Sequence, residues 1–281
     1  MTYCVAIKLN AGLVMLSDSR TNAGVDHISS FRKMAVFEKP GDRVMVLLSS
    51  GNLAISQSVK QHLMNADEGR AIWTAKSLYE VAETIGAAIR KIWQRENEAL
   101  KDAGVEFNIN MLLGGQIEGE GCRLFHIYSA GNFIEATDEN CYFQIGESKY
   151  GKPILDRVVN PETPLDEAAK CALISMDSTL KSNLSVGLPL DMVVYGAGSL
   201  RVTHVAHIDE KNAYFQMIRN AWGARLKQVF MEIEAPVWAE KTTTTVAYQP
   251  LRDHSAEGAG RDNAAPLQQL SLGSALTAQR G

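Results

Sequence analysis

The chain has 281 residues, of which 46% are hydrophobic and 21% are charged, as in soluble globular proteins with room for a substantial core. Its formal net charge is -4 and it contains no long run of lysine and arginine, so the sequence indicates neither a nucleic acid nor an anionic membrane as a partner. The longest aliphatic runs, such as residues 44–48, are too short to span a bilayer, and the first residues do not resemble a signal peptide. We therefore expect a cytoplasmic protein.

The first half of the chain predicts two strand pairs followed by two helices. Residues 2–9 alternate between apolar and smaller or polar positions, and a turn at residues 10–12 leads into a second strand at 13–18. A second pair is expected at 33–37 and 43–49, around a Pro-Gly-Asp turn. Apolar residues at helical spacing then predict helices over about 53–66 and 74–103.

The second half predicts strands, a helical stretch, further strands and a last helix. Strands are expected between about residues 108 and 145, with turns at Gly114-Gly115 and at residues 119–121. Helical pattern returns after Ser148, and Thr163 and Pro164 predict the start of a helix. Strands at 190–195 and 201–208 precede a last amphipathic helix over about 210–233.

Strands and helices are grouped rather than alternating, which favours an α+β fold over a parallel βαβ sheet. Two antiparallel sheets face to face, with helices outside both, would bury every apolar stripe, so we predict a four-layer αββα sandwich. Residues 1–249 would form this domain. Residues 250–281 are rich in Ala, Gly, Gln and Ser and lack aromatic residues, which predicts a flexible C-terminal tail.

Metal and cofactor chemistry is not indicated by the sequence. The cysteines at positions 4, 122, 141 and 171 are widely separated and form no CxxC motif, which favours reduced core thiols. His204 and His207 are three apart on a predicted strand, so they point to opposite faces and do not suggest a metal pair. We predict no metal and no cofactor.

The first predicted hairpin brings chemically useful groups together. A two- or three-residue loop around residue 11 places Thr2 opposite the segment 18–21, so that its hydroxyl lies beside Asp18. Lys33 begins the next strand and reaches the same place if that strand is adjacent, although Arg32 competes for this role. A threonine hydroxyl needs a nearby base, and a free α-amino group serves as one. Thr2 has such an amine only after Met1 is removed, which a small second residue permits.

These residues resemble a known family in their order and spacing. The elements that match the proteasome β-subunit and HslV pattern are Thr2, the Asp18-Ser19-Arg20-Thr21 run, Lys33 and the Ser49-Ser50-Gly51 turn after an apolar strand. The opening Met-Thr-Tyr-Cys-Val and the extended C-terminus are most similar to the Anbu group of bacterial proteasome relatives. The resemblance covers about residues 2–245 and implies an N-terminal-nucleophile hydrolase fold.

The resemblance implies a catalytic role for several positions. Thr2 would supply both nucleophile and amine, Asp18 would polarise Lys33, and Lys33 would ease the deprotonation of Thr2. The backbone N–H of Ser50 or Gly51, next to the positive end of the following helix, would form the oxyanion hole.

Four further positions are implied, Ser148 and Ser185 as catalytic residues and Asn22 and Leu48 as substrate-binding residues. Ser148 matches the serine near the α-amine, and Ser185 matches the serine of a later family motif. Asn22 would lie on the strand that pairs with a bound peptide. Leu48 would lie near the first specificity pocket and favour an apolar substrate side chain.

The function that follows is a threonine-type endopeptidase that acts on peptides or proteins through an acyl-enzyme. The resemblance also implies self-association into a ring or an open helical assembly, and an unidentified ATPase partner is possible. Two other functions stay open: a catalytically silent scaffold subunit of the same fold, and a small-molecule amidase.

Overall fold

The computed structural model describes residues 2–23, 27–65, 69–236, 238–239 and 269–270. The chain divides into two compact units, Met1–Trp222 and Gly223–Gly281. In the second unit, the short strands β13 (Trp238–Ala239) and β14 (Gln269–Leu270) pair antiparallel, and the end of helix α6 (Ala213–Glu232) also belongs to this unit. The domain boundary predicted at residue 249 and most of the predicted tail lie outside the described residues.

The first sheet of the larger unit has five antiparallel strands in the order β10-β1-β2-β11-β12. Its hairpin of β1 and β2 is buried on both faces, because odd-numbered β1 residues pack among the helices while Cys4 and Ala6 pack against the other sheet. The strands are β1 (Tyr3–Leu9), β2 (Gly12–Asp18), β10 (Tyr142–Gly146), β11 (Leu190–Gly196) and β12 (His204–Ile208).

The second sheet also has five antiparallel strands, in the order β5-β6-β7-β8-β9. Its centre is almost wholly buried, since β6 and β7 are covered on both faces. The strands are β5 (Met34–Lys39), β6 (Arg43–Gly51), β7 (Ile109–Ile117), β8 (Arg123–Ile127) and β9 (Phe133–Glu135). A separate two-stranded ribbon, β3 (Arg20–Ala23) with β4 (His27–Ser30), connects the two sheets along the chain.

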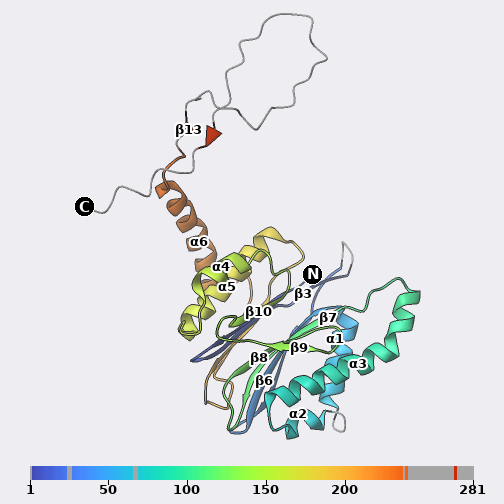
Figure 1. The fold of residues 1–281 in the computed structure, drawn as a ribbon. Helices are drawn as coiled ribbons and strands as arrows, with labels where there is room; N and C mark the ends of the chain where they lie inside the picture. The colour runs from blue at the N-terminus through green and yellow to red at the C-terminus, as the bar shows by residue number, and fades with distance from the viewer. Residues whose placement is uncertain (1, 24–26, 66–68, 237, 240–268, 271–281) are drawn as a thin grey trace, which may run out of the picture. The chain divides into compact units, whose positions relative to one another are not determined.

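The helices cover the outer faces of the two sheets, as Figure 1 shows. One apolar core joins the second sheet to α1 (Leu53–Met64), α2 (Arg70–Thr74) and α3 (Leu78–Asp102). Another joins the first sheet to α4 (Lys152–Val158) and α5 (Leu165–Ser182), and a third fills the space between the sheets. The predicted four-layer αββα sandwich is therefore confirmed. Within the described part of the chain, no helix is both long and apolar enough to span a membrane.

Two local predictions were wrong. Gly114 and Gly115 do not form a turn but lie inside β7, where a side chain on Gly114 would meet the Met15 sulfur at 2.7 Å and one on Gly115 would meet the Val44 carbonyl at 2.2 Å. The pair serves close packing, a use of glycine that sequence patterns do not separate from a turn. The helix predicted from residue 74 begins only after Ser77, whose side chain caps α3 by accepting the N–H of Glu80 at 3.2 Å.

Candidate active site

The hairpin of β1 and β2 brings Asp18 to the beginning of the chain. Cys4 pairs with Ser17, so the next pair outward places Tyr3 opposite Asp18. The Tyr3 backbone N–H donates to Asp18 Oδ1 at 3.0 Å, and Thr2 itself is buried, with 8% of its surface exposed. The carboxylate therefore lies against the peptide bond that joins Thr2 to Tyr3.

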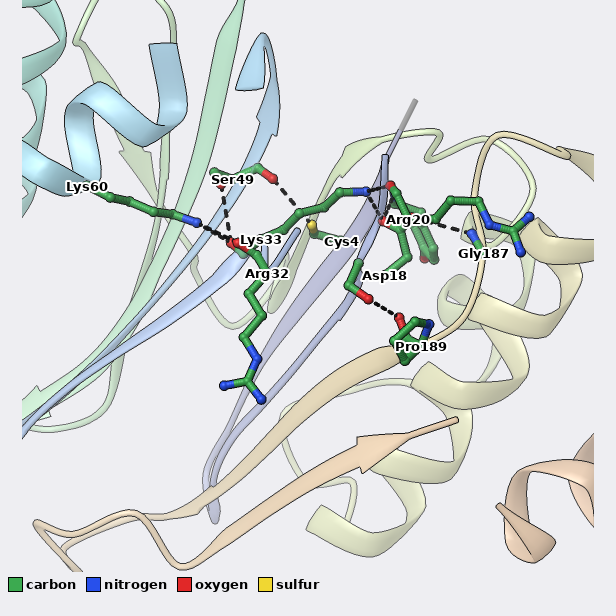
Figure 2. A network of polar contacts seen from close by, with 11 residues as sticks. Cys4, Asp18, Arg20, Arg32, Lys33, Ser49, Lys60, Gly187 and Pro189 are labelled. Carbon is green, nitrogen blue, oxygen red and sulfur yellow. Dashed lines mark hydrogen bonds and ion pairs between the residues drawn. The ribbon is translucent and has the colours of Figure 1, made fainter. Parts of the chain in front are cut away.

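Lys33 joins this carboxylate from the other sheet. Its Nζ lies 2.7 Å from Asp18 Oδ1 and donates to the Arg20 carbonyl at 2.6 Å, as Figure 2 shows. The Lys33 and Asp18 side chains are only 6% and 0% exposed, whereas Arg32 is exposed. Because Asp18 Oδ1 accepts both the Tyr3 N–H and the lysine, the ammonium group lies close to Thr2.

The charge state of Asp18 reflects two opposing effects. Burial raises the pKa of its carboxyl, while the Lys33 ammonium and the backbone N–H groups of Tyr3 and Gly187 act in the opposite direction. The Gly187 N–H lies 3.4 Å from Oδ2. Removing any of these donors would leave a buried carboxylate short of partners, so the group depends on its full set of contacts.

Strand β10 closes the site on the other side of β1. Tyr3 pairs with Gly146, and the Glu147 N–H donates to the Thr2 carbonyl at 2.8 Å. Gly146 has φ +82°, and a side chain there would lie 1.9 Å from the Thr2 carbonyl oxygen, so only glycine fits. Ser148 follows two residues later, where its N–H bonds the Gly146 carbonyl at 3.0 Å, and its expected role near the α-amine stays a prediction.

The backbone at the end of β6 distinguishes between Ser50 and Gly51, the two residues predicted to form the oxyanion hole. In an antiparallel ladder, successive residues direct their N–H groups to opposite neighbours. The Ser49 N–H bonds the Lys33 carbonyl on the β5 side, and the Asn52 N–H bonds the Asn108 carbonyl on the β7 side. Alternation therefore directs the Ser50 N–H toward β7. It directs the Gly51 N–H to the β5 side, where Lys33 lies just before the first residue of β5.

Gly51 is also held in a conformation that other residues avoid. Its φ is +102°, and a side chain on it would meet the Asn108 carbonyl at 2.4 Å. The next residue, Asn52, caps α1 by accepting the Ala54 N–H at 2.9 Å. An N–H at a strand end that strand alternation directs away from β7, followed directly by a helix N-terminus, is a suitable anion-stabilising arrangement.

The loop between α5 and β11 packs against Asp18 and its neighbours. Gly187 bonds Asp18, Ser19 Oγ donates to the Pro189 carbonyl at 2.7 Å, and Arg20 donates to the Leu184 carbonyl at 3.3 Å. Ser185 lies in this loop, where its N–H bonds the Asn183 side chain at 2.9 Å. The family resemblance pointed to this loop through Ser185, but no sequence pattern predicted the contacts of Gly187 and Pro189, which lie about 170 residues beyond Asp18 and Ser19.

The two residues predicted to bind substrate, Asn22 and Leu48, lie in different parts of the structure. Asn22 lies on β3, opposite Ile28 of β4, so it is part of the ribbon that follows Asp18. Leu48 is fully buried in the core between the sheets. Its burial does not favour direct contact with a substrate, and its role as a pocket wall stays a prediction.

Metal binding finds no support in the part of the chain that the structure describes. No group of three or more His, Cys, Asp or Glu side chains there is placed to hold a metal ion. The site offers three chemical groups: the buried carboxylate–ammonium pair of Asp18 and Lys33, the hydroxyl of Thr2, and the backbone N–H of Gly51 on the side of Lys33.

The arrangement of two sheets, with the chain start and a Lys–Asp pair between them, defines a proteasome-like N-terminal-nucleophile fold. Solved structures agree with this. The chain is 53% identical to Anbu, the ancestral β-subunit, from Yersinia bercovieri, with 83% of this chain and 98% of that chain covered and a TM-score of 0.78. The helical assembly of the Anbu complex from Pseudomonas aeruginosa is 42% identical, with coverage of 84% and 98% and a TM-score of 0.76. The chain belongs to the Anbu family.

The chain is also similar, at lower identity, to a curated proteasome subunit. The proteasome subunit beta of Haloquadratum walsbyi is 24% identical over 212 residues, which cover 74% of this chain and 79% of that protein. No family model matches the chain.

Proposed function

We propose that this protein is a cytoplasmic threonine-type endopeptidase in which Thr2, once Met1 is removed, cleaves peptide bonds through an acyl-enzyme. One observation carries the proposal: Asp18 Oδ1 accepts both the Tyr3 N–H at 3.0 Å and the Lys33 ammonium at 2.7 Å. A nearly enclosed ion pair is costly to build, and this one lies directly beside the residue whose hydroxyl and amine would react.

The proposed reaction begins with proton transfer from the Thr2 hydroxyl to its own α-amine. A free α-amino group has a pKa of about 8, so roughly a tenth of it is unprotonated and basic at pH 7. The positive charge of Lys33 stabilises the developing alkoxide, and Asp18 holds that charge in place. The Thr2 oxygen then bonds to the scissile carbonyl carbon, whose oxygen becomes negatively charged.

The second half of the reaction releases both products. The Gly51 N–H stabilises the oxyanion, and this assignment rests on the strand alternation that directs Ser50 elsewhere. The leaving amine takes the proton from the Thr2 α-ammonium as the peptide bond breaks. Water then attacks the Thr2 ester and gives a proton to the same amine. The Thr2 oxygen takes that proton back as its bond to the acyl carbon breaks, and the product leaves as a carboxylic acid that ionises in water.

The remaining predicted residues take supporting roles. Ser148, beside the start of β1, would hydrogen-bond near the Thr2 amine, and Ser185 would support the loop that contacts Asp18. Asn22, on the ribbon after Asp18, would bind the substrate backbone. An apolar substrate side chain remains the expected preference, with Leu48 behind the pocket rather than on its surface.

We also propose that the active sites lie within a self-associated oligomer. A relative that is 42% identical was solved as a helical assembly, which supports self-association of this chain. An enclosed or partly enclosed space would keep an unselective threonine nucleophile away from folded proteins. An ATPase partner that delivers unfolded chains stays a prediction.

The proposal is tested by hydrolysis assays on wild type and Thr2→Ala, because alanine also permits removal of Met1 and leaves the processing unchanged. Wild type should lose Met1 by intact mass and cleave fluorogenic peptides, whereas Thr2→Ala should cleave none and assemble normally. Retention of Met1 without cleavage would indicate a silent scaffold. Cleavage of small amides but not peptides would indicate an amidase.

A further inference from the structure

A second lysine contacts the backbone of Lys33 from outside the site. Lys60 lies on α1, and its Nζ donates to the carbonyls of Arg32 and Lys33 at 3.2 and 3.1 Å. Figure 2 shows Lys60 approaching these carbonyls from the opposite side to Asp18. Lys60 thus joins the helical layer to the short segment that carries the lysine of the ion pair.

The Lys33 carbonyl is held by an unusual number of donors. It accepts the Ser49 N–H at 3.1 Å, the Ser49 hydroxyl at 3.2 Å and Lys60 Nζ at 3.1 Å. A carbonyl oxygen has two lone pairs, so this acceptor is fully used. Lys33 is therefore fixed at both ends, by Asp18 and Arg20 at its ammonium and by β6 and α1 at its backbone.

The charge of Lys60 has no obvious structural benefit. Among the described residues, no carboxylate forms an ion pair with it. Burial lowers the pKa of Lys60 from its usual value of 10.5 to about 8, the Lys33 charge acts in the same direction, and Cys4 opposes them. The other charged or titratable residues that line its cavity between α1 and α3 are His62, Lys91 and Arg95. A partly buried cation costs stability, and a neutral side chain would pack more cheaply.

We propose that Lys60 is a positioning residue for the Thr2 peptidase site: it holds the Arg32–Lys33 backbone so that the Lys33 ammonium stays on Asp18 beside Thr2. This inference rests on the proposed function. Among the described residues, Lys60 donates only to backbone carbonyls, so the proposed role is exerted through Lys33 and not on the reacting atoms. Its loss should therefore slow the chemical step and leave substrate affinity unchanged.

The test measures how fast an N-terminal-threonine-directed covalent inhibitor labels the full chain, followed by intact mass. Wild type, Lys60→Met, Lys60→Arg and the exposed control Lys101→Met are compared, and saturation kinetics separate the limiting labelling rate from inhibitor affinity. The limiting rate of Lys60→Met should fall about tenfold to a hundredfold at unchanged affinity, as expected for a small displacement of a catalytic group. Lys60→Arg, which keeps a cationic donor, should stay within about threefold of wild type, and so should Lys101→Met.

Melting temperatures separate positioning from general support of the fold. Lys60→Met should melt no lower than wild type, because it removes a buried charge. Labelling of Lys60→Met at the wild-type rate would overturn the inference. So would slow labelling accompanied by a lower melting temperature and not restored in Lys60→Arg, since Lys60 would then be structural. Wild-type protein that has lost Met1 and is not labelled at all would instead overturn the proposed function, and this inference with it.

Discussion

Two aspartates of this protein are fully buried and paired with cations, and their surroundings differ. Asp18 pairs at 2.7 Å with Lys33, whose side chain is only 6% exposed. Asp177 of α5 pairs with Lys181 at 3.2 Å and Arg219 at 2.9 Å, whose side chains are 50% and 40% exposed. The cations of Asp177 keep part of their hydration, so that group contributes to packing at modest cost. Asp18 and Lys33 lose nearly all of theirs, a cost that the proposed chemistry at Thr2 would explain.

The largest predicted effect is a loss of hydrolysis on substitution of the Asp18–Lys33 pair, which is not expected for the Asp177 group. Asp18→Asn and Lys33→Ala should each lower peptide hydrolysis by about a thousandfold or more, and the double variant should be little worse than the worse single one. Both residues serve one proton transfer, so their effects overlap. Steady-state kinetics on all four proteins form a double-mutant cycle, and multiplicative losses would count against a shared role.

A smaller loss of peptide hydrolysis is expected for a substitution at the end of β6. Gly51→Ala places a methyl group 2.4 Å from the Asn108 carbonyl at φ +102°, so the backbone must shift. We expect hydrolysis to fall about a hundredfold, because the proposed oxyanion donor moves. Gly41→Ala is the matched control: its φ is +80°, but a side chain there meets nothing within 4 Å. It should lose stability, by about 1–3 kcal/mol, and keep activity. Equal activity of the two variants would contradict the assignment of Gly51.

The comparison predicts the opposite behaviour for Asp177. Asp177→Asn should lower the free energy of unfolding by about 1–3 kcal/mol, because it weakens the charged hydrogen bond from Arg219 and removes the ion pair with Lys181. Hydrolysis should change by less than about threefold under conditions where the variant is folded. Urea unfolding and kinetics measure the two quantities, and a loss of activity comparable with that of Asp18→Asn would remove the distinction between the two groups.

The smallest effect concerns pH. Because the pKa of Lys60 is lowered from 10.5 to about 8, the unfolded chain binds more protons than the folded one between these values. The unfavourable contribution of Lys60 to stability is therefore fully present below pH 8 and is relieved as pH rises toward 10.5. The unfolding free energy of wild type should increase relative to that of Lys60→Met over this window. Parallel curves for the two proteins would show that Lys60 carries no such shift.

The sequence predicted contacts between residues that are close in the chain better than contacts between residues that are far apart in it. The hairpin of β1 and β2 follows from alternation and a short turn, and it alone brings Thr2 and Asp18 together. The approach of Lys33 needed the neighbouring sheet, and family resemblance supplied what spacing did not. Gly187 and Lys60 were missed because their contacts depend on how α5 and α1 pack, which no local pattern specifies. Gly114 and Gly115 were misread since close packing and turns both select glycine.

The central claim is that Thr2 is the nucleophile, and the most direct measurement is peptide mapping by mass spectrometry after incubation with an N-terminal-threonine-directed covalent inhibitor. The account predicts that Met1 is absent, that the adduct lies on Thr2, and that Asp18→Asn labels far more slowly than Asp177→Asn. A chain that has lost Met1 but carries no adduct on Thr2, or one whose adduct lies on another residue and persists in Thr2→Ala, would contradict it.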